Sequence, residues 1–321
     1  MIEASAPGKV ILFGEHFVVR GTRAIATAVN LRARVRVERA EDKIVIESKN
    51  LDLRAVLERS LSSDVRAELA PYVSVLRALQ ERGYSLVPHR AVIASEMPLS
   101  AGLGSSAATS VAYALAYSAL HGDPLKEEEL FQVSMAGERV AHGNPSGIDN
   151  AIAVRGGTIV YRRGEPPKGA NARLSNFLLL VVNSGDMRST KEAVEGVLRL
   201  AERYWDVMER VYAAVDRLVE RALQFMEEGN GPGLGELMNI NHGLLSAVGV
   251  STTKLDLIAH ELRRAGALGS KLTGAGRGGC VIALVEKERA EQVARHMTSL
   301  GYETYVSEVG APGARVEYIF K

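Results

Sequence analysis

The chain has 321 residues, and its 39 lysines and arginines nearly balance its 38 aspartates and glutamates. This balance excludes a strong global attraction to nucleic acid or to a membrane surface. The length favours two domains, and the single cysteine, Cys280, excludes an internal disulfide framework and fits a reducing cytosol. Because no apolar run reaches the roughly 20 residues of a membrane span, we expect a cytoplasmic protein.

The first part of the chain predicts a mixture of strands and helices. An amphipathic helix is expected over 64–83, and strands are expected at 2–8, 9–14, 24–40, 43–48 and 89–98. In the longest of these strands Arg32, Arg34 and Arg36 alternate with apolar residues, which indicates a half-exposed strand with a charged outer face. An RNA-binding stripe is the alternative interpretation, but no aromatic residues are interleaved with these arginines.

A turn rich in glycine and serine, "PLSAGLGSSA", then leads into an apolar segment that ends near Leu120. The segment is apolar almost all round, which predicts a helix buried on most sides, with Ser105 or Ser106 as its N-cap. A further helix is expected from Pro124, with Asp123 as its N-cap.

The second half begins after a turn-rich stretch at 164–171, which predicts two domains with the bounds 1–168 and 169–321. A buried strand is expected at 177–185, followed by three helical segments between 190 and 265. The order strand–helix–strand–strand over 279–320 suggests a small α+β sandwich with helices on one face.

Two loops, at 102–107 and 274–279, match the glycine spacing of a dinucleotide-binding fingerprint. Neither loop has both the preceding strand and the following helix that this fingerprint needs, and Walker A and protein-kinase signatures are absent. Gly102 and Gly104 still allow the backbone to approach a ligand, and the helix behind them presents N–H groups and a positive dipole end. These features favour a phosphate site, although a tight entry turn into a buried helix explains this segment equally well when it is taken alone.

Two further loops place charged side chains beside glycine turns. "SAPGKVILFGEH" carries Lys9, Glu15 and His16, and "GERVAHGNPSGIDNA" carries Glu138 and Asp149. Taken singly, each of these residues is also explained as an ordinary structural or solvated side chain. The histidine spacing and the lone cysteine do not form a zinc site, and no G-x-S-x-G elbow supports a serine hydrolase.

Together, three motifs resemble those of the GHMP kinase superfamily and occur in the same order. They are "APGKVILFGEHFVVRG" at 6–21, "PLSAGLGSSAA" at 98–108 and "KLTGAGRGGC" at 271–280. Within the superfamily the chain most resembles the mevalonate kinases, through "GKVILFGEHFVV", "HGNPSGIDNA" and "NSGDMRSTKEAV". The resemblance implies an α+β fold, with an N-terminal domain like domain 2 of ribosomal protein S5 and a ferredoxin-like C-terminal domain.

The same resemblance implies transfer of the ATP γ-phosphate to the 5-hydroxyl of mevalonate. Asp149 would accept the hydroxyl proton with Lys9 beside it, and Ser106 and Glu138 would hold Mg²⁺. The residues expected at mevalonate are Glu15, His16, Arg188 and Thr190. The residues expected at ATP are Pro98, Leu99, Ser100, Ala101, Gly102, Leu103, Gly104, Ser105, Ser106, Ala107 and Ala108, with Gly274, Ala275 and Gly276 on the other side.

Two alternatives remain open from the sequence. One is a kinase of the same superfamily that acts on phosphomevalonate or a sugar, and the other is a nucleotide-binding regulator that has lost catalysis. The expected partners are mevalonate and ATP, without nucleic acid or membrane. The oligomeric state, a homodimer included, is not decided by the sequence.

Overall fold

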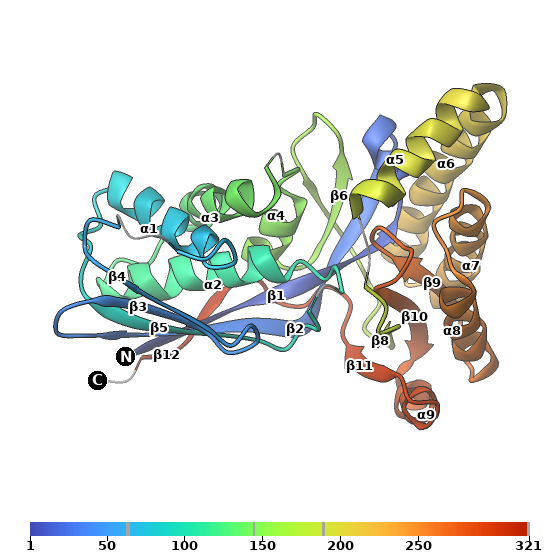
Figure 1. Cartoon of the computed structure of the whole chain (residues 1–321). Coiled ribbons are helices and arrows are strands. Elements are labelled where there is room, and N and C mark those ends of the chain that lie inside the picture. The colour runs from blue at the N-terminus through green and yellow to red at the C-terminus, as the bar shows by residue number, and fades with distance from the viewer. Residues whose placement is uncertain (62–64, 100, 144, 188–189, 320–321) are drawn as a thin grey trace.

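The computed structural model describes residues 1–61, 65–99, 101–143, 145–187 and 190–319. Two layered bodies lie side by side, and the start of the chain lies beside residues 315–319 at the outer end of the first body (Figure 1). Each body combines a sheet with helices, which confirms the α+β prediction. In the described residues no helix is both long and apolar enough to cross a bilayer.

The first body is built on a sheet of eight strands among the described residues. Its order is β12-β1-β2-β5-β3-β4, while β6 pairs with β2 and β7 pairs with β6. The strands are β1 (Ile2–Phe13), β2 (Arg23–Arg39), β3 (Ile44–Ser48), β4 (Leu53–Leu57), β5 (His89–Ser95), β6 (Thr158–Arg162), β7 (Lys168–Ala170) and β12 (Arg315–Ile319). The two short strands expected at 2–8 and 9–14 form one strand, because β1 keeps its pairing with β2 across a register shift between Pro7 and Gly8.

Strand β2 shows the predicted alternation, with one correction. Val35 and Val37 are fully buried, whereas Arg34 and Arg36 lie on the outer face and form ion pairs with glutamates, among them Glu3. Arg32 was expected on that outer face but is only 4% exposed. Its guanidinium donates to two backbone carbonyls of the returning C-terminal segment, and these contacts remove it from solvent.

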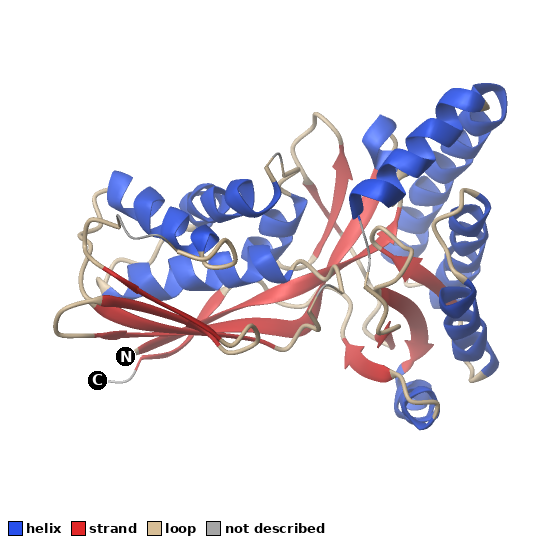
Figure 2. Ribbon diagram, in the orientation of Figure 1, coloured by secondary structure: helices blue, strands red, loops and turns tan. Residues whose placement is uncertain are grey.

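A layer of helices from the first body covers one face of this sheet, as Figure 2 shows. They are α1 (Ala70–Glu81), α2 (Ser105–Leu120), α3 (Glu127–His142) and α4 (Ile148–Arg155). Helix α2 is buried from residue 107 to residue 118, which confirms the buried-helix prediction. Its tyrosines, Tyr113 and Tyr117, pack against His89 of β5, and the Tyr113 hydroxyl hydrogen bonds to the His89 ring.

Both predicted helix caps are wrong. The residue before α2 is Gly104 at φ 76°, and no side chain caps the helix, because the two serines are already its first helical residues. Helix α3 starts at Glu127 rather than near Pro124, and the residue before it is Lys126 rather than Asp123. Three glutamates in its first turn favour this start, since negative charge is stabilised at a helix N-terminus.

The second body contains an antiparallel sheet with the order β11-β8-β10-β9 among the described residues. Its strands are β8 (Phe177–Asn183), β9 (Gly269–Thr273), β10 (Cys280–Glu286) and β11 (Glu303–Ser307). Its helices are α5 (Thr190–Arg203), α6 (Trp205–Glu228), α7 (Gly231–Ala247), α8 (Thr253–Arg264) and α9 (Lys287–Ser299). In the described part of 190–265 there are therefore four helices and not the predicted three, because the chain turns at Gly229 and Asn230 and also breaks at Tyr204.

The two bodies share a hydrophobic core. On β8, Leu180 and Val182 pack with residues of α8 and α9, whereas Leu179 and Val181 belong to the core that continues into the first sheet. In addition, the last strand, β12, leaves the second body and pairs with β1. The division at 168 and 169 stays a prediction, and it has to accommodate this returning strand.

Candidate active site

A cleft of about 830 Å³ lies between the two bodies. It is walled by β1 and the turn after it, by the glycine-rich turn before α2, by the ends of α3 and α4, and by the start of α5. Most of the residues predicted to carry function line it. They are Lys9, Glu15, His16, Pro98, Ala101, Gly102, Leu103, Gly104, Ser105, Ser106, Glu138, Asp149, Thr190, Gly274 and Ala275.

The predicted catalytic pair is formed. The Nζ atom of Lys9, from β1, lies 3.3 Å from Oδ1 of Asp149, in the first turn of α4. Lys9 is 8% exposed, and its backbone N–H donates to the carbonyl of Leu103 at 2.8 Å, which fixes the glycine-rich turn against β1. The ammonium of Lys9 and the carboxylate of Asp149 therefore face the same point of the cleft.

Glu138 projects from α3 toward the same point and is only 3% exposed. Burial raises the pKa of its carboxyl group, the nearby Ser106 hydroxyl lowers it, and the charge of Asp149 raises it again. Its Oε1 atom is buried without a hydrogen-bond partner in the described structure. A buried, unsatisfied carboxylate oxygen beside a serine hydroxyl is a fitting donor set for Mg²⁺.

The described residues contain no group of three His, Cys, Asp or Glu side chains arranged for a metal ion. Mg²⁺ does not require such a group, because it is usually held by one or two carboxylates together with waters and substrate phosphates. Glu138 and Ser106 therefore fit a magnesium ion that arrives with a nucleotide.

The glycine-rich turn before α2 presents its backbone to the cleft. Gly102 and Gly104 have φ values of 77° and 76°, a region that favours glycine. A Cβ atom on Gly104 would lie 3.2 Å from Cγ of Lys9 and 3.5 Å from Oδ2 of Asp149. The first N–H groups of α2 have no partners within the helix, so they are available to an anion in the cleft.

The second glycine loop, between β9 and β10, meets the cleft with Gly274 and Ala275 only. Gly276 packs against the turn before α8. A Cβ atom on Gly276 would lie 2.2 Å from the carbonyl oxygen of Val250 in that turn. That carbonyl accepts the backbone N–H of Arg277 at 2.7 Å. Gly276 thus allows close backbone packing and does not line the cleft.

Glu15 and His16 reach the cleft but are engaged by the second body. The carboxylate of Glu15 forms a buried ion pair with Lys271 of β9. Burial raises the pKa of Glu15, and the charge of Lys271 opposes this effect. Nε2 of His16 lies 2.8 Å from the carbonyl oxygen of Ala275, so the turn after β1 is tied directly to the second glycine loop.

Comparison with known proteins agrees with this geometry. Residues 71–157 match the GHMP kinases N terminal domain, and residues 222–303 match the GHMP kinases C terminal region. A mevalonate kinase from Aeropyrum pernix is 45% identical over 316 residues, which is 98% of each chain. The chain belongs to the GHMP kinase family.

Solved structures give the same answer for the fold of this GHMP kinase. The mevalonate kinase of Methanococcus jannaschii has a TM-score of 0.86 at 26% identity, covering 96% of this chain and 98% of its own. The L. major mevalonate kinase in complex with R-mevalonate has a TM-score of 0.81 at 28% identity, covering 96% of each chain. The predicted two-domain GHMP kinase fold is confirmed.

Some residues predicted for the site of this GHMP kinase lie elsewhere. Ala107 and Ala108 are buried inside α2, and Leu99 is 58% exposed outside the cleft. Ser100 and Arg188 lie outside the described residues.

Other cleft residues were not predicted from the sequence. They are Ile11, Val18, Val19, His142, Pro145, Ser146, Gly147, Asn150, Lys191 and Val194. For one of them a signal existed, because His142 follows Glu138 by four residues on α3 and so shares its helix face. The apolar members carry no signal that separates a cleft wall from ordinary core.

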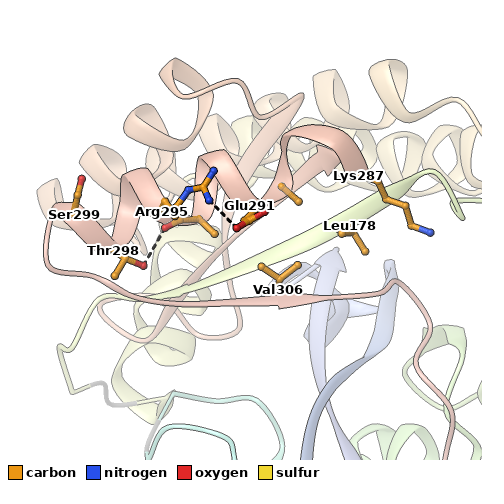
Figure 3. Close-up of a pocket in the computed structure, with 9 residues that line it drawn as sticks. Leu178, Lys287, Glu291, Arg295, Thr298, Ser299 and Val306 are labelled. Atoms are coloured by element: carbon orange, nitrogen blue, oxygen red, sulfur yellow. Dashed lines mark hydrogen bonds and ion pairs between the residues drawn. The ribbon is translucent and has the colours of Figure 1, made fainter.

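A second hollow, of about 700 Å³, lies between α9 and strands β8 and β11 (Figure 3). Its walls include Leu178 and Val306, and along its rim Arg295 pairs with Glu291 at 2.7 Å. It contains none of the residues predicted for the site. The residues predicted to carry the chemistry, Lys9 and Asp149, lie in the cleft between the two bodies.

Proposed function

We propose that this GHMP kinase is a mevalonate kinase, which transfers the γ-phosphoryl group of ATP to the 5-hydroxyl of mevalonate. The observation that carries the proposal is the 45% identity with a mevalonate kinase over 98% of both chains. The cleft supports it with a proton acceptor, a cation and a phosphate-binding turn within one small volume.

Asp149 accepts the proton as the mevalonate oxygen forms its bond to the γ-phosphorus, and the bond from that phosphorus to ADP breaks. Lys9 lies beside this carboxylate and stabilises negative charge on the attacking oxygen. The N–H groups at the start of α2 bind phosphate oxygens and hold them in line with the attacking hydroxyl. Positioning and electrostatic stabilisation supply most of the rate enhancement in this class of reaction.

Glu138 and Ser106 are proposed to hold Mg²⁺, which when bound offsets the negative charge of the ATP phosphates. The support for this assignment is the buried, unsatisfied oxygen of Glu138 and the nearby Ser106 hydroxyl. Contacts of Glu15, His16, Thr190 and Arg188 with mevalonate stay predictions, as do a cytoplasmic location and a homodimer.

The test is an assay of ADP release with mevalonate, phosphomevalonate, galactose and homoserine offered separately. We expect rapid turnover with mevalonate and at most background with the other three. A preference for another acceptor would overturn the substrate assignment but leave a kinase. ATP binding without turnover on any acceptor would instead support a regulator.

A further inference from the structure

The buried pair of Glu15 and Lys271 connects the sequence motif at 6–21 to the sequence motif at 271–280. Glu15 lies in the turn after β1 and is 1% exposed, and Lys271 lies in the middle of β9 and is 0% exposed. Nζ of Lys271 also donates to the carbonyl of Leu272 at 2.7 Å and approaches that of Ile11 at 3.5 Å. An ammonium group has three N–H donors, so these acceptors and Glu15 occupy all of them.

The contacts around this pair join β1 to β9 at further points. The Thr273 hydroxyl accepts from the backbone N–H of Ile11 at 2.9 Å and donates to its carbonyl at 3.0 Å. Beyond Glu15, His16 holds the Ala275 carbonyl. Ile11 is two residues from Lys9. These links therefore fix β1 to β9 close to Lys9.

His16 sits at φ 63°, in the left-handed region that a residue other than glycine rarely adopts. Such a conformation persists only when its surroundings hold it in place. The adjacent ion pair and the bond to Ala275 are those surroundings. Stability alone does not explain a pair of fully buried charges, because well-packed apolar residues of similar size often stabilise a protein as much or more.

We propose that Glu15 and Lys271 are a positioning pair, which holds His16 against the Ala275 carbonyl and so sets the place of His16 where the acceptor substrate binds. Glu15 then acts through Lys271, in place of the direct contact with mevalonate that the sequence predicts for Glu15. The inference rests on the proposed kinase function for its readout, because it concerns the substrate wall of the same cleft.

The test compares Glu15→Gln, Lys271→Met and the double variant Glu15→Leu with Lys271→Met. Each single change leaves one polar partner buried and should lower the melting temperature. The double change removes both charges and should restore much of the melting temperature. We expect its KM for the acceptor to remain raised at least roughly tenfold, with a smaller change in the KM for ATP, since small misplacements of a substrate carry large kinetic costs.

A matched control is the double variant Arg23→Met with Asp216→Leu. This pair also joins the two bodies, with Nη2 of Arg23 2.8 Å from Oδ2 of Asp216, but it connects β2 to α6 away from the cleft. We expect the control to change the melting temperature while the KM for the acceptor stays at the wild-type value.

Recovery of both melting temperature and KM in the Glu15 and Lys271 double variant would overturn the proposal and leave a purely structural pair. A raised KM in Glu15→Gln with a normal KM in Lys271→Met would also overturn it, because Glu15 would then contact the substrate directly. If the double variant does not fold, Glu15→Asp tests the proposal instead, because it keeps the charge but shortens the side chain. Positioning predicts a raised KM there, and an unchanged KM contradicts it.

Wild-type protein in the same assay separates the two claims. Turnover of a different acceptor by the wild type would refute the mevalonate assignment, and the KM comparison would then be made on that acceptor. Absence of turnover on any acceptor would refute the kinase function itself, and the same variants would then be compared by calorimetric titration with mevalonate.

Discussion

The glycine loop before α2 and the glycine loop before β10 have similar spacing, but their glycines face different neighbours. A Cβ atom on Gly104 would meet the side chains of Lys9 and Asp149, which are the proposed catalytic residues. A Cβ atom on Gly276 would meet the backbone of Val250, and one on Gly278 would meet the backbone carbonyl of Asp186. Glycine in the first loop leaves the backbone open toward the cleft, and glycine in the second loop allows two backbone segments to pack together.

This difference follows from what comes after each loop. The first loop enters a helix, whose initial N–H groups are free to bind an anion, and the second enters β10, whose N–H groups are used in the sheet. The same letters in a sequence therefore do not predict the same role. Substitutions at the two loops should separate loss of function from loss of stability.

The largest effect is expected at Asp149, which lies on α4 and faces the first loop across the cleft. Asp149→Asn should lower kcat by about 10²–10⁴-fold, because an amide cannot accept the proton of the hydroxyl. Nucleotide affinity should survive, since the backbone of the first loop is unchanged. Single-turnover kinetics and calorimetry with an ATP analogue measure the two quantities, and a variant that keeps most of its kcat would remove Asp149 from the mechanism.

At the second loop, Gly276→Val should lower the free energy of unfolding by roughly 2–4 kcal/mol, the sum of overpacking and a left-handed conformation. Gly276 has φ 71° and a backbone oxygen 2.2 Å from the position of a Cβ atom. Gly301→Val is the control, because Gly301 has φ 87° with no atom within 4 Å. Denaturant unfolding of both variants measures the difference, and equal losses would mean that the contact with Val250 is unimportant.

The helix behind the first loop should be sensitive to acid. Burial lowers the pKa of His89 to about 4, from an ordinary value near 6.5. Between these values the unfolded chain binds more protons, so this stability is complete above pH 6.5 and is lost as the pH falls toward 4, by roughly 3 kcal/mol in all.

Unfolding at several pH values should therefore give a flatter pH profile for His89→Gln than for the wild type. His242, behind the second loop, is the comparison, because burial lowers its pKa while Asp256 opposes the effect. We expect His242→Gln to change the profile less. An identical profile for His89→Gln and wild type would show that His89 is not responsible.

Gly104→Val should reduce nucleotide affinity by about tenfold or more, while its stability falls by about 1–2 kcal/mol, as for Gly301→Val. The branched side chain would occupy space between Lys9 and the phosphates. Calorimetric titration beside a thermal melt distinguishes the two losses. A folded variant with unchanged affinity would argue that this turn only introduces a buried helix.

The smallest effect is expected for Glu138→Gln, which should raise the Mg²⁺ concentration for half-maximal activity roughly several-fold, because a neutral amide oxygen is a weaker ligand. Glu128→Gln is the control, since Glu128 lies on the same helix with its side chain 72% exposed. Mg²⁺ titration of both variants measures the change. Equal dependence in both would make Glu138 a structural residue.

Periodicity predicted the faces of the strands and the buried character of α2, because both depend on residues close together in the chain. It did not predict what covers a face. The burial of Arg32 depends on carbonyls at residues 312 and 313, and the partner of Glu15 is 256 residues away. Contacts over such separations leave no periodic signal in a single sequence.

The candidate site was largely predictable through its motifs, and Lys9, Asp149 and Glu138 do meet at one point. The helix caps were not predictable in this way. Ser105, Ser106 and Asp123 are good N-caps by residue type, but the N-cap positions of α2 and α3 are occupied by Gly104 and Lys126. A cap preference is about 1 kcal/mol, which tertiary packing readily exceeds.

The pairing of β12 with β1 also sets an order for synthesis and folding. Every strand of the first sheet lies between residues 2 and 170, except the edge strand β12 at 315–319. At roughly 5–20 residues per second, the intervening segment takes on the order of 10–30 seconds to synthesise. During that interval β1 presents an open strand edge, and Arg32 lacks two of its carbonyl acceptors. The nascent chain therefore completes its first sheet only when residues 315–319 have been made.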